Sequence, residues 1–217
     1  MRFAKHGEWF QLNVQRALAN NSVNYKEKPD VGTFMREWLS LYDSKSGERG
    51  IYNGLSAKRT VERTNGRYRD GNGNGIIRRE PREDFGTNPC SEIILRSREF
   101  CNLSEVVIRR DDTSESLKEK VRNATILGTF QSTLTEFKYL SREWKRNCDE
   151  ERLLGVSLTG IMDNPLTNGS KKGLDKLLEE LRDIAYETNK EWADKLGIPV
   201  SAAITCVKPS GTVSQLV

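Results

Sequence analysis

Residues 174–207 read LDKLLEELRDIAYETNKEWADKLGIPVSAAITCV, and this stretch decides the fold class. Apolar side chains recur at helical spacing from Leu174 onward, and Gly197 and Pro199 end the predicted helix. Residues 200–207 follow at once as an apolar run suited to a buried strand. A long helix that leads straight into a buried strand is typical of an α/β protein whose strands pair in parallel.

A second helix is expected after Pro29. Apolar residues recur there at intervals of three and four, which predicts an amphipathic helix with an aromatic-rich buried face. The positions on this face are Val31, Phe34, Met35, Trp38, Leu39 and Tyr42. Gly47 stands just past the expected end of the helix.

The middle of the chain combines short apolar runs with a third helix. Residues 93–95 and 106–108 are apolar enough to form strands or extended chain, and residues 155–162 predict either a buried strand or a tight strand–helix junction. Asp112, with Glu115 three residues later, forms a capping-box pattern, so a helix is expected from there to about residue 134. The side chains that this helix is expected to bury are Leu117, Val121, Ala124, Leu127 and Leu134.

The chain of 217 residues is polar for a globular protein. Hydrophobic residues make up 35% of it and charged residues 30%, and the mean hydropathy is −0.68. The net charge of +4 is spread through the sequence, so no nucleic-acid-binding surface is predicted. The sequence has no apolar run of about 18 residues and no apolar leader at its N-terminus, which predicts a cytosolic protein without a membrane span.

Residues 63–84 are rich in glycine, arginine and asparagine and show little periodicity. The run RDGNGNG, which begins at Arg69, predicts a flexible loop. Its arginines could contact phosphates, but nearby acids balance their charge, which favours a solvated loop. These acids are Glu62, Asp70, Glu80 and Glu83.

Four cysteines in a cytosolic chain of this size do not predict a disulfide scaffold. Zinc is a poor fit, because His6 is the single histidine and no two cysteines have C-x-x-C spacing, so no metal site is expected. Cys148 lies among charged residues and is expected at the surface. Cys206 lies in the apolar run and is expected to be a small buried side chain.

Residues 88–103 read NPCSEIILRSREFCNL and hold the other two thiols. On an extended strand, Asn88, Cys90 and Glu92 would line one face. A thiol, a carboxylate and an amide that converge can act as a hydrogen-atom or nucleophilic centre, a general base and a hydroxyl-binding group. Cys101 could form a redox pair with another thiol. On spacing alone, a thiol filler beside an exposed charge explains the pattern better, because such short patterns are common by chance.

The last ten residues read KPSGTVSQLV and follow the predicted strand. Gly211 lets a ligand approach the backbone, Ser210 and Thr212 offer hydroxyl groups, and a following helix N-terminus would present free amides. These features suit an anion such as a phosphate. An ordinary strand–helix turn with a Ser or Thr cap explains the same residues.

Taken together, the segments resemble one family. NPCSEI, FCNLSEV, LGTFQSTLTEF, RLLGVSLTGIMD and KPSGTVSQL follow in the order found in the catalytic subunit of ribonucleotide reductases. The Pro before the cysteine and the small residue before the glutamate resemble the adenosylcobalamin-dependent class most closely. ALANNSV and WLSLYDSKSGERGIYN extend the resemblance upstream, so that it covers nearly the whole chain.

The resemblance implies a role for each residue around the two thiols. Cys90 matches the cysteine that becomes a thiyl radical and removes the 3′ hydrogen of the ribose. Glu92 matches the carboxylate that takes the proton of the 3′ hydroxyl, and Asn88 matches the amide that hydrogen-bonds the substrate hydroxyls. Cys101 matches one member of the dithiol that supplies the reducing electrons and is oxidised to a disulfide in each turnover.

The resemblance also implies a phosphate loop, a fold, a cofactor and partners. The residues that match the substrate-phosphate loop are Pro209, Ser210, Gly211, Thr212, Val213 and Ser214. The implied fold is part of a ten-stranded α/β barrel, with residues 1–217 as one partial catalytic barrel domain and the radical cysteine on a finger loop inside it. The implied cofactor is adenosylcobalamin. The implied partners are a ribonucleoside di- or triphosphate, the remaining segments of the reductase, and an external thiol reductant such as thioredoxin, with no membrane or nucleic acid.

Parts of the family pattern lie outside this sequence. The second redox cysteine, the shuttle cysteines, the allosteric region and most barrel strands are expected elsewhere, so we expect an internal or split-gene fragment that cannot turn over alone. Three alternatives stay open. They are a fragment of an oxygen-dependent reductase with a separate iron subunit, a non-catalytic piece derived from a reductase, and a basic module whose nucleic-acid binding would depend strongly on salt.

Overall fold

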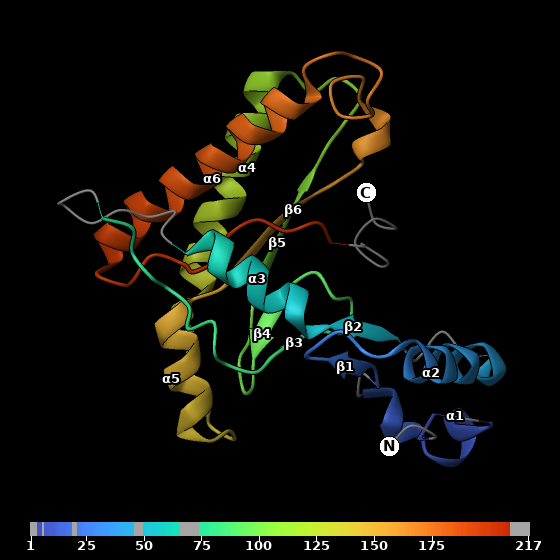
Figure 1. Ribbon diagram of the computed structural model, residues 1–217. Coiled ribbons are helices and arrows are strands. Elements are labelled where there is room, and N and C mark those ends of the chain that lie inside the picture. Colours follow the sequence, from blue (N-terminus) through green and yellow to red (C-terminus); the bar gives the residue numbers. More distant parts are fainter. Residues whose placement is uncertain (1–3, 6, 19–20, 46–49, 66–73, 209–217) are drawn as a thin grey trace. The chain divides into compact units, whose positions relative to one another are not determined.

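The computed structural model describes residues 4–5, 7–18, 21–45, 50–65 and 74–208 (Figure 1). Its contacts divide the chain into two units, Met1–Ser97 and Arg98–Val217. The elements of the first unit are α1 (Trp9–Leu12), the 3-10 helix η1 (Val14–Leu18), β1 (Val23–Tyr25), α2 (Val31–Ser44), β2 (Ile51–Asn53), α3 (Gly54–Thr64), β3 (Phe85–Thr87) and β4 (Ile94–Arg96).

The first unit contains two small sheets around a limited core. Strands β1 and β2 pair in parallel, and β3 and β4 form an antiparallel hairpin. The buried side chains of Ala57, Val61 and Phe85 form a cluster, against which Tyr52 and Ile94 pack. This cluster joins α3 to the hairpin, so the helix supports the two strands that follow it.

Helix α2 confirms the predicted helix, but its apolar face is not buried. The Asp30 carboxylate caps its N-terminus by accepting from Thr33 N at 2.9 Å, and Lys45 ends it with a left-handed φ of 50°. The prediction of a buried face was wrong for every residue of the stripe, because these local signals form the helix without specifying what packs on it. The exposed stripe is Val31, Phe34, Met35, Trp38, Leu39 and Tyr42.

Helix α3 falls in a stretch for which the sequence predicted no element. Asn53 caps it by accepting from Ser56 N at 2.9 Å, and Ala57 and Val61 face the core four residues apart. The signal was present, but the glycines and arginines on either side hid it. Most of the RDGNGNG run lies outside the described residues.

The second unit is built on a parallel strand pair. Its elements are β5 (Asn102–Val107), α4 (Ser114–Gln131), α5 (Arg142–Glu151), β6 (Leu154–Thr159), the 3-10 helix η2 (Ile161–Asp163) and α6 (Leu174–Leu196). The register of the pair runs from Asn102 opposite Leu154 to Val107 opposite Thr159. Helix α4 packs along both strands, and α6 packs along α4 (Figure 1). This arrangement confirms the predicted α/β class with parallel pairing.

Helix α4 confirms the predicted middle helix with two corrections. The capping box is one residue further on than predicted, because Thr113 and Ser116 exchange the bonds between side chain and backbone. The helix ends at Gln131, and Leu127 and Leu134 are exposed. Gly128 takes the buried position instead, since a Cβ there would lie 3.2 Å from Leu154 Cδ2.

Helix α6 confirms the long predicted helix and its end at Gly197, which has a left-handed φ of 64°. The predicted strand at 200–207 is wrong in part, because only the bridge from Thr205 to Val156 has strand geometry. The segment still runs beside β6, where Leu154 N donates to Ala203 O at 2.9 Å and Val156 N donates to Ile204 O at 2.8 Å.

Helix α5 is another element that the sequence analysis missed. Its run REWKRNCDEE is so highly charged that no apolar stripe was apparent. It nevertheless buries Asn147, Cys148 and Glu151 on one face. The expectation that Cys148 lies at the surface was therefore wrong, because in a helix the exposure of a side chain depends on its face and not on its sequence neighbours.

Candidate active site

Cys90 lies at the tip of the β3–β4 hairpin. Phe85 pairs with Arg96 and Thr87 pairs with Ile94, so residues 88–93 form the connection between the strands. The Cys90 side chain is exposed. Ser91 follows it with a φ of 65°, a left-handed conformation that residues other than glycine adopt mainly in turns. The thiol is thus carried on a projecting turn.

Asn88 organises this turn. Its carbonyl oxygen accepts from Ser91 N at 3.0 Å, and its side-chain Oδ1 accepts from Ile93 N at 3.1 Å. The prediction that Asn88, Cys90 and Glu92 line one face of an extended strand was therefore wrong. Asn and Pro favour turns because the Asn side chain bonds nearby backbone and Pro fixes φ, and here that local preference prevails over strand formation.

The turn still keeps the three predicted side chains on one short loop. Asn88 and Glu92 are half-buried, whereas Cys90 is exposed. Because Oδ1 of Asn88 is already engaged by the Ile93 amide, the amide nitrogen is the end of this side chain that is suited to a ligand. The loop therefore presents a thiol, with an amide donor and a carboxylate two residues away on either side.

Side chains from elsewhere in the first unit fix the base of the hairpin. Asn24 Nδ2 donates to Phe85 O at 3.3 Å, and the Tyr52 hydroxyl donates to Gly86 O at 3.1 Å. Burial raises the pKa of Tyr52, with the charge of Arg79 acting in the opposite direction, so the hydroxyl keeps the proton that it donates.

Arg79 holds the other strand of the hairpin. Its guanidinium donates to Ile94 O at 2.9 Å and lies over the Phe85 ring at 5.0 Å from the centroid. Asn65 in turn fixes the Arg79 backbone, by donating to Arg79 O at 2.7 Å and accepting from Arg79 N at 3.1 Å. The sequence analysis assigned this region to a solvated loop, but Arg79 is buried. A single arginine in a Gly-rich run gave no sign in the sequence that its side chain is buried against the hairpin.

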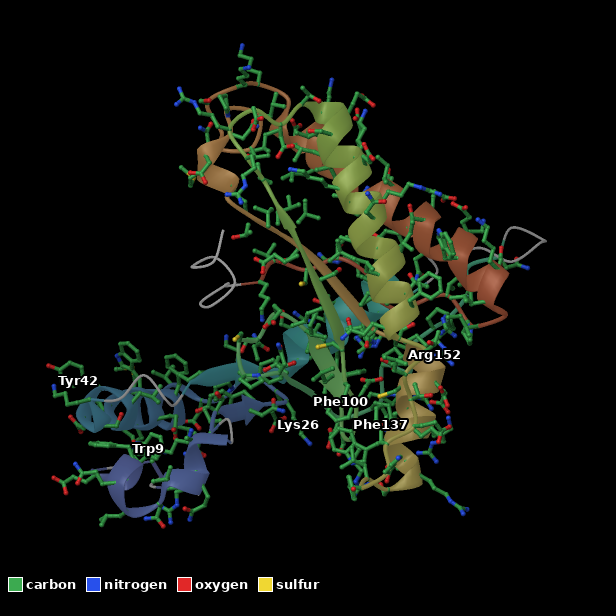
Figure 2. The ribbon with its side chains drawn as sticks, turned by 180° about the vertical axis from the view of Figure 1, so that it is seen from behind. Trp9, Lys26, Tyr42, Phe100, Phe137 and Arg152 are labelled. Atoms are coloured by element: carbon green, nitrogen blue, oxygen red, sulfur yellow. The ribbon has the colours of Figure 1, made fainter. Side chains whose placement is uncertain are left out.

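Cys101 immediately precedes β5 in the second unit and is half-buried. The neighbouring Asn102 donates both its backbone N–H and its Nδ2 to Leu153 O at 2.9 Å, which fixes the start of the strand. A cavity of about 260 Å³ opens beside the thiol. Its lining residues are Phe100, Cys101, Asn102, Gln131, Ser132, Leu134, Thr135, Phe137 and Cys148. Phe100 and Phe137, both labelled in Figure 2, contribute rings that meet edge to face.

The remaining candidate residues stand as follows. Pro209, Ser210, Gly211, Thr212, Val213 and Ser214 of the predicted phosphate loop lie outside the described residues. The segment that leads to them is anchored, because Ser201 N donates to Asn189 Oδ1 at 2.9 Å and Ala202 N donates to Glu151 O at 2.8 Å. Cys206 is half-buried rather than buried as expected.

Within the described part of the chain, no cluster of three or more His, Cys, Asp or Glu side chains could hold a metal ion. Among the same residues, no helix has the length and apolar character needed to cross a membrane.

No protein-family model matches the chain. The chain is 30% identical over 234 residues to an adenosylcobalamin-dependent ribonucleoside-triphosphate reductase of Lactobacillus helveticus, a match that covers 95% of this chain and 29% of that protein. It is 32% identical over 171 residues to a protein of the same name from Euglena gracilis, covering 78% of this chain and 21% of that one. The resemblance to the adenosylcobalamin-dependent class is confirmed.

A crystal structure of a B-12 dependent (class II) ribonucleotide reductase is also similar, with a TM-score of 0.60. The sequences are 23% identical, and the match covers 96% of this chain and 31% of that chain. This likeness shows a shared fold. The chain spans less than a third of the length of the curated relatives that it matches.

Proposed function

We propose that this chain, which matches adenosylcobalamin-dependent ribonucleotide reductases along 95% of its length, is the segment of such an enzyme that carries the radical-forming thiol. The observation that carries the proposal is the position of Cys90, exposed at the tip of a hairpin whose base is fixed by Asn24, Tyr52 and Arg79. A thiol that removes a hydrogen atom from a sugar must both project and be held in place.

Adenosylcobalamin, when bound, supplies the radical chemistry. The chain fits that cofactor through Cys90, because an exposed thiol at a hairpin tip is accessible to a group that approaches the loop. The group that this chain would contribute to that chemistry is the Cys90 thiol.

In the proposed reaction, the Cys90 thiyl radical takes the 3′ hydrogen of the ribose. Glu92, two residues along the same loop, accepts the proton of the 3′ hydroxyl, and the 2′ hydroxyl leaves as water after taking a proton from a thiol of the redox pair to which Cys101 belongs. Asn88 donates from its amide nitrogen to a substrate hydroxyl while its Oδ1 holds the turn. One short loop thus provides the hydrogen acceptor, the base and the hydroxyl-binding group.

Cys101 supplies reducing electrons together with a second cysteine from another segment of the reductase. The pair becomes a disulfide in each turnover, and an external thiol reductant such as thioredoxin restores it. Residues 209–214 hold the substrate phosphates. The names of the relatives favour a triphosphate over a diphosphate, and a comparison of CTP with CDP as substrates tests that choice.

We also propose that the parallel β5–β6 pair, with α4 packed along it, is part of a ten-stranded α/β barrel completed by the remaining segments of the reductase. Both strand pairing and helix cover agree with such a barrel. The apolar stripe of α2, whose side chains are 38 to 78% exposed, supports a further contact with those segments.

Reconstitution tests the proposal. The chain is combined with polypeptides that supply the remaining segments, with adenosylcobalamin, CTP and a dithiol, and deoxyribonucleotide is measured. We expect cofactor-dependent product that is lost in Cys90→Ser and retained in the matched control Cys206→Ser. Activity only with an iron-containing subunit would assign the chain to the oxygen-dependent class. A folded complex in which wild type and Cys90→Ser are equally inactive would favour a non-catalytic piece.

A further inference from the structure

Arg98, three residues before Cys101, has an unusual backbone conformation. Arg98 has a φ of 57°, in the left-handed region that costs a residue with a side chain about 1–2 kcal/mol. Such conformations persist where the surrounding structure enforces them. Four side chains on one face of α5 contact Arg98 and Phe100.

Two of these contacts are to backbone groups. Asn147 Nδ2 donates to Arg98 O at 3.2 Å, and Phe100 N donates to Cys148 Sγ at 3.3 Å. Both helix residues are buried, at 5% and 7% exposed. The backbone of this segment is not paired with a strand at these groups, so hydrogen bonds to side chains fix its path instead.

The other two contacts are between side chains. Glu143, one turn before Asn147, forms an ion pair with Arg98. Trp144, one turn before Cys148, stacks on the Phe100 ring with centroids 4.6 Å apart and planes 28° apart. The Phe137 ring meets the same ring edge-on, with centroids 5.2 Å apart and planes 71° apart.

Helix α5 is itself anchored within the second unit. Arg152, at its C-terminal end, donates to Ser132 O at 2.6 Å just after α4. Lys145 donates to Glu136 at 2.7 Å and to Thr135 Oγ1 at 3.2 Å. The position of α5 is therefore set by its contacts with the rest of the second unit as well as by its contacts with Arg98 and Phe100.

We infer that α5 positions the Cys101 thiol by gripping the residues that precede it, with Glu143, Trp144, Asn147 and Cys148 as positioning residues. Cys101 lies between two constraints: the clamp on Arg98 and Phe100, and the β5 pairing that begins at Asn102. Cys101 and Cys148 also line the same cavity, which places the clamp beside the thiol itself. The redox role of Cys101 rests on the proposed function, but the clamp does not.

The test measures each thiol separately in the folded full-length chain. Iodoacetamide alkylation of Cys101, Cys206 and Cys90 is followed by peptide mass spectrometry, without cofactor or nucleotide. In Cys148→Ala we expect Cys101 to react about fivefold faster, the factor that corresponds to losing one net hydrogen bond. The Phe100 amide should lose hydrogen-exchange protection by a similar factor, because its acceptor is gone.

Three variants give the result its meaning. Cys148→Ser restores an acceptor and should return the Cys101 rate to within about twofold of wild type. Trp144→Ala removes the stacked ring and should accelerate Cys101 by about tenfold. Glu150→Ala changes an exposed residue of the same helix and should leave the rate unchanged.

Unchanged Cys101 reactivity in both Cys148→Ala and Trp144→Ala would overturn the inference. Equal acceleration of Cys101 and Cys206 would indicate that the whole unit is loosened. Cys148→Ser then decides, because a Cys101 alkylation rate that stays high in this variant would also overturn the inference. Because no step needs radical chemistry, a failed reconstitution leaves this result intact, and the two failures are distinguishable.

Discussion

The two thiol-bearing regions of the chain are held in opposite ways. Cys90 is exposed on a turn, and the bonds that fix its hairpin act on the strands below it, from Asn24, Tyr52 and Arg79. Cys101 is half-buried between a strand start and a helix whose side chains contact the adjacent residues. At Cys90, the turn is held by bonds of Asn88 within the loop, and its base is fixed by side chains from other elements. At Cys101, side chains of a separate helix hold the preceding residues.

This difference matches the two tasks proposed for the thiols. A hydrogen-abstracting sulfur has to meet the substrate directly, so protein atoms around it would block the approach. A redox sulfur reacts with a second thiol, and that reaction depends on the angle and distance at which the two sulfurs meet. The comparison predicts that substitutions in the two regions will fail in different ways.

The largest expected effect separates the two thiols by reaction step. In the reconstituted enzyme, Cys90→Ser should lose deoxyribonucleotide formation and also the release of 3′ tritium from labelled substrate, since no thiol is left to take that hydrogen. Cys101→Ser should lose reduction but retain tritium release, because a hydrogen held on the Cys90 thiol exchanges with water. Tritium release that survives in Cys90→Ser would break the assignment of Cys90.

The next effect concerns stability in the first unit. Phe85 is 4% exposed at the base of the hairpin, so Phe85→Ala should cost about 3–4 kcal/mol of unfolding free energy. Cys90→Ala at the exposed tip should change it by less than about 0.5 kcal/mol. Urea titrations followed by hydrogen exchange of the β3 and β4 amides measure both. Similar losses of unfolding free energy in the two variants would mean that the hairpin tip contributes as much to stability as its base, which contradicts the comparison.

The corresponding test in the second unit targets a buried polar network. Asn189, 1% exposed on α6, donates to Thr129 Oγ1 at 2.9 Å and to Ser201 Oγ at 3.0 Å, and accepts from Ser201 N. Asn189→Ala leaves the buried Ser201 N–H and hydroxyl without a partner, while the Thr129 hydroxyl keeps its bond to Thr125 O, and should cost about 2–3 kcal/mol. The neighbouring exposed Lys190→Ala serves as control in the same urea titration, and equal effects would contradict a role for the network.

Elements with strong local signals could be predicted from the sequence. The leucine spacing and the glycine end of α6 specify a helix in almost any surroundings, and the structure places its C-cap at Gly197. The stripe of α2 specified a helix equally well but not its burial, because burial depends on what packs against it. Local sequence determines the element, whereas the partner surface is a property of the rest of the molecule.

The candidate site shows the same limit. The residue types at Asn88, Cys90 and Glu92 indicated the chemistry, but an even spacing was taken as a strand where Asn88 makes a turn. The supports of both thiols were not predicted at all. Arg79 and the face of α5 act through contacts between residues distant in sequence, and both lie in charged runs where hydrophobic periodicity gives no signal.

The smallest expected effect comes from Asp112, which lies just before α4. Its carboxylate, 7% exposed, accepts from Arg109 N at 2.7 Å, Ser116 Oγ at 2.7 Å and Lys120 Nζ at 2.6 Å. Burial acts to raise the pKa of Asp112, but the bonds from Lys120, Arg109 and Ser116 outweigh it, so the pKa in the folded chain is lowered.

A lowered folded-state pKa means that the ionised carboxylate stabilises the fold above the pKa of the unfolded chain, about 3.9. That stabilisation disappears as the pH falls through the lower folded-state value. Asp112→Asn should therefore cost about 1 kcal/mol at pH 7 and progressively less below about pH 4. Asp111→Asn, which changes the adjacent exposed carboxylate, should show no such convergence with wild type. If the unfolding free energy lost in Asp112→Asn stays constant down to pH 3, the loss does not come from the charge of the carboxylate. The ionised form of Asp112 would then contribute nothing to the stability of the start of α4.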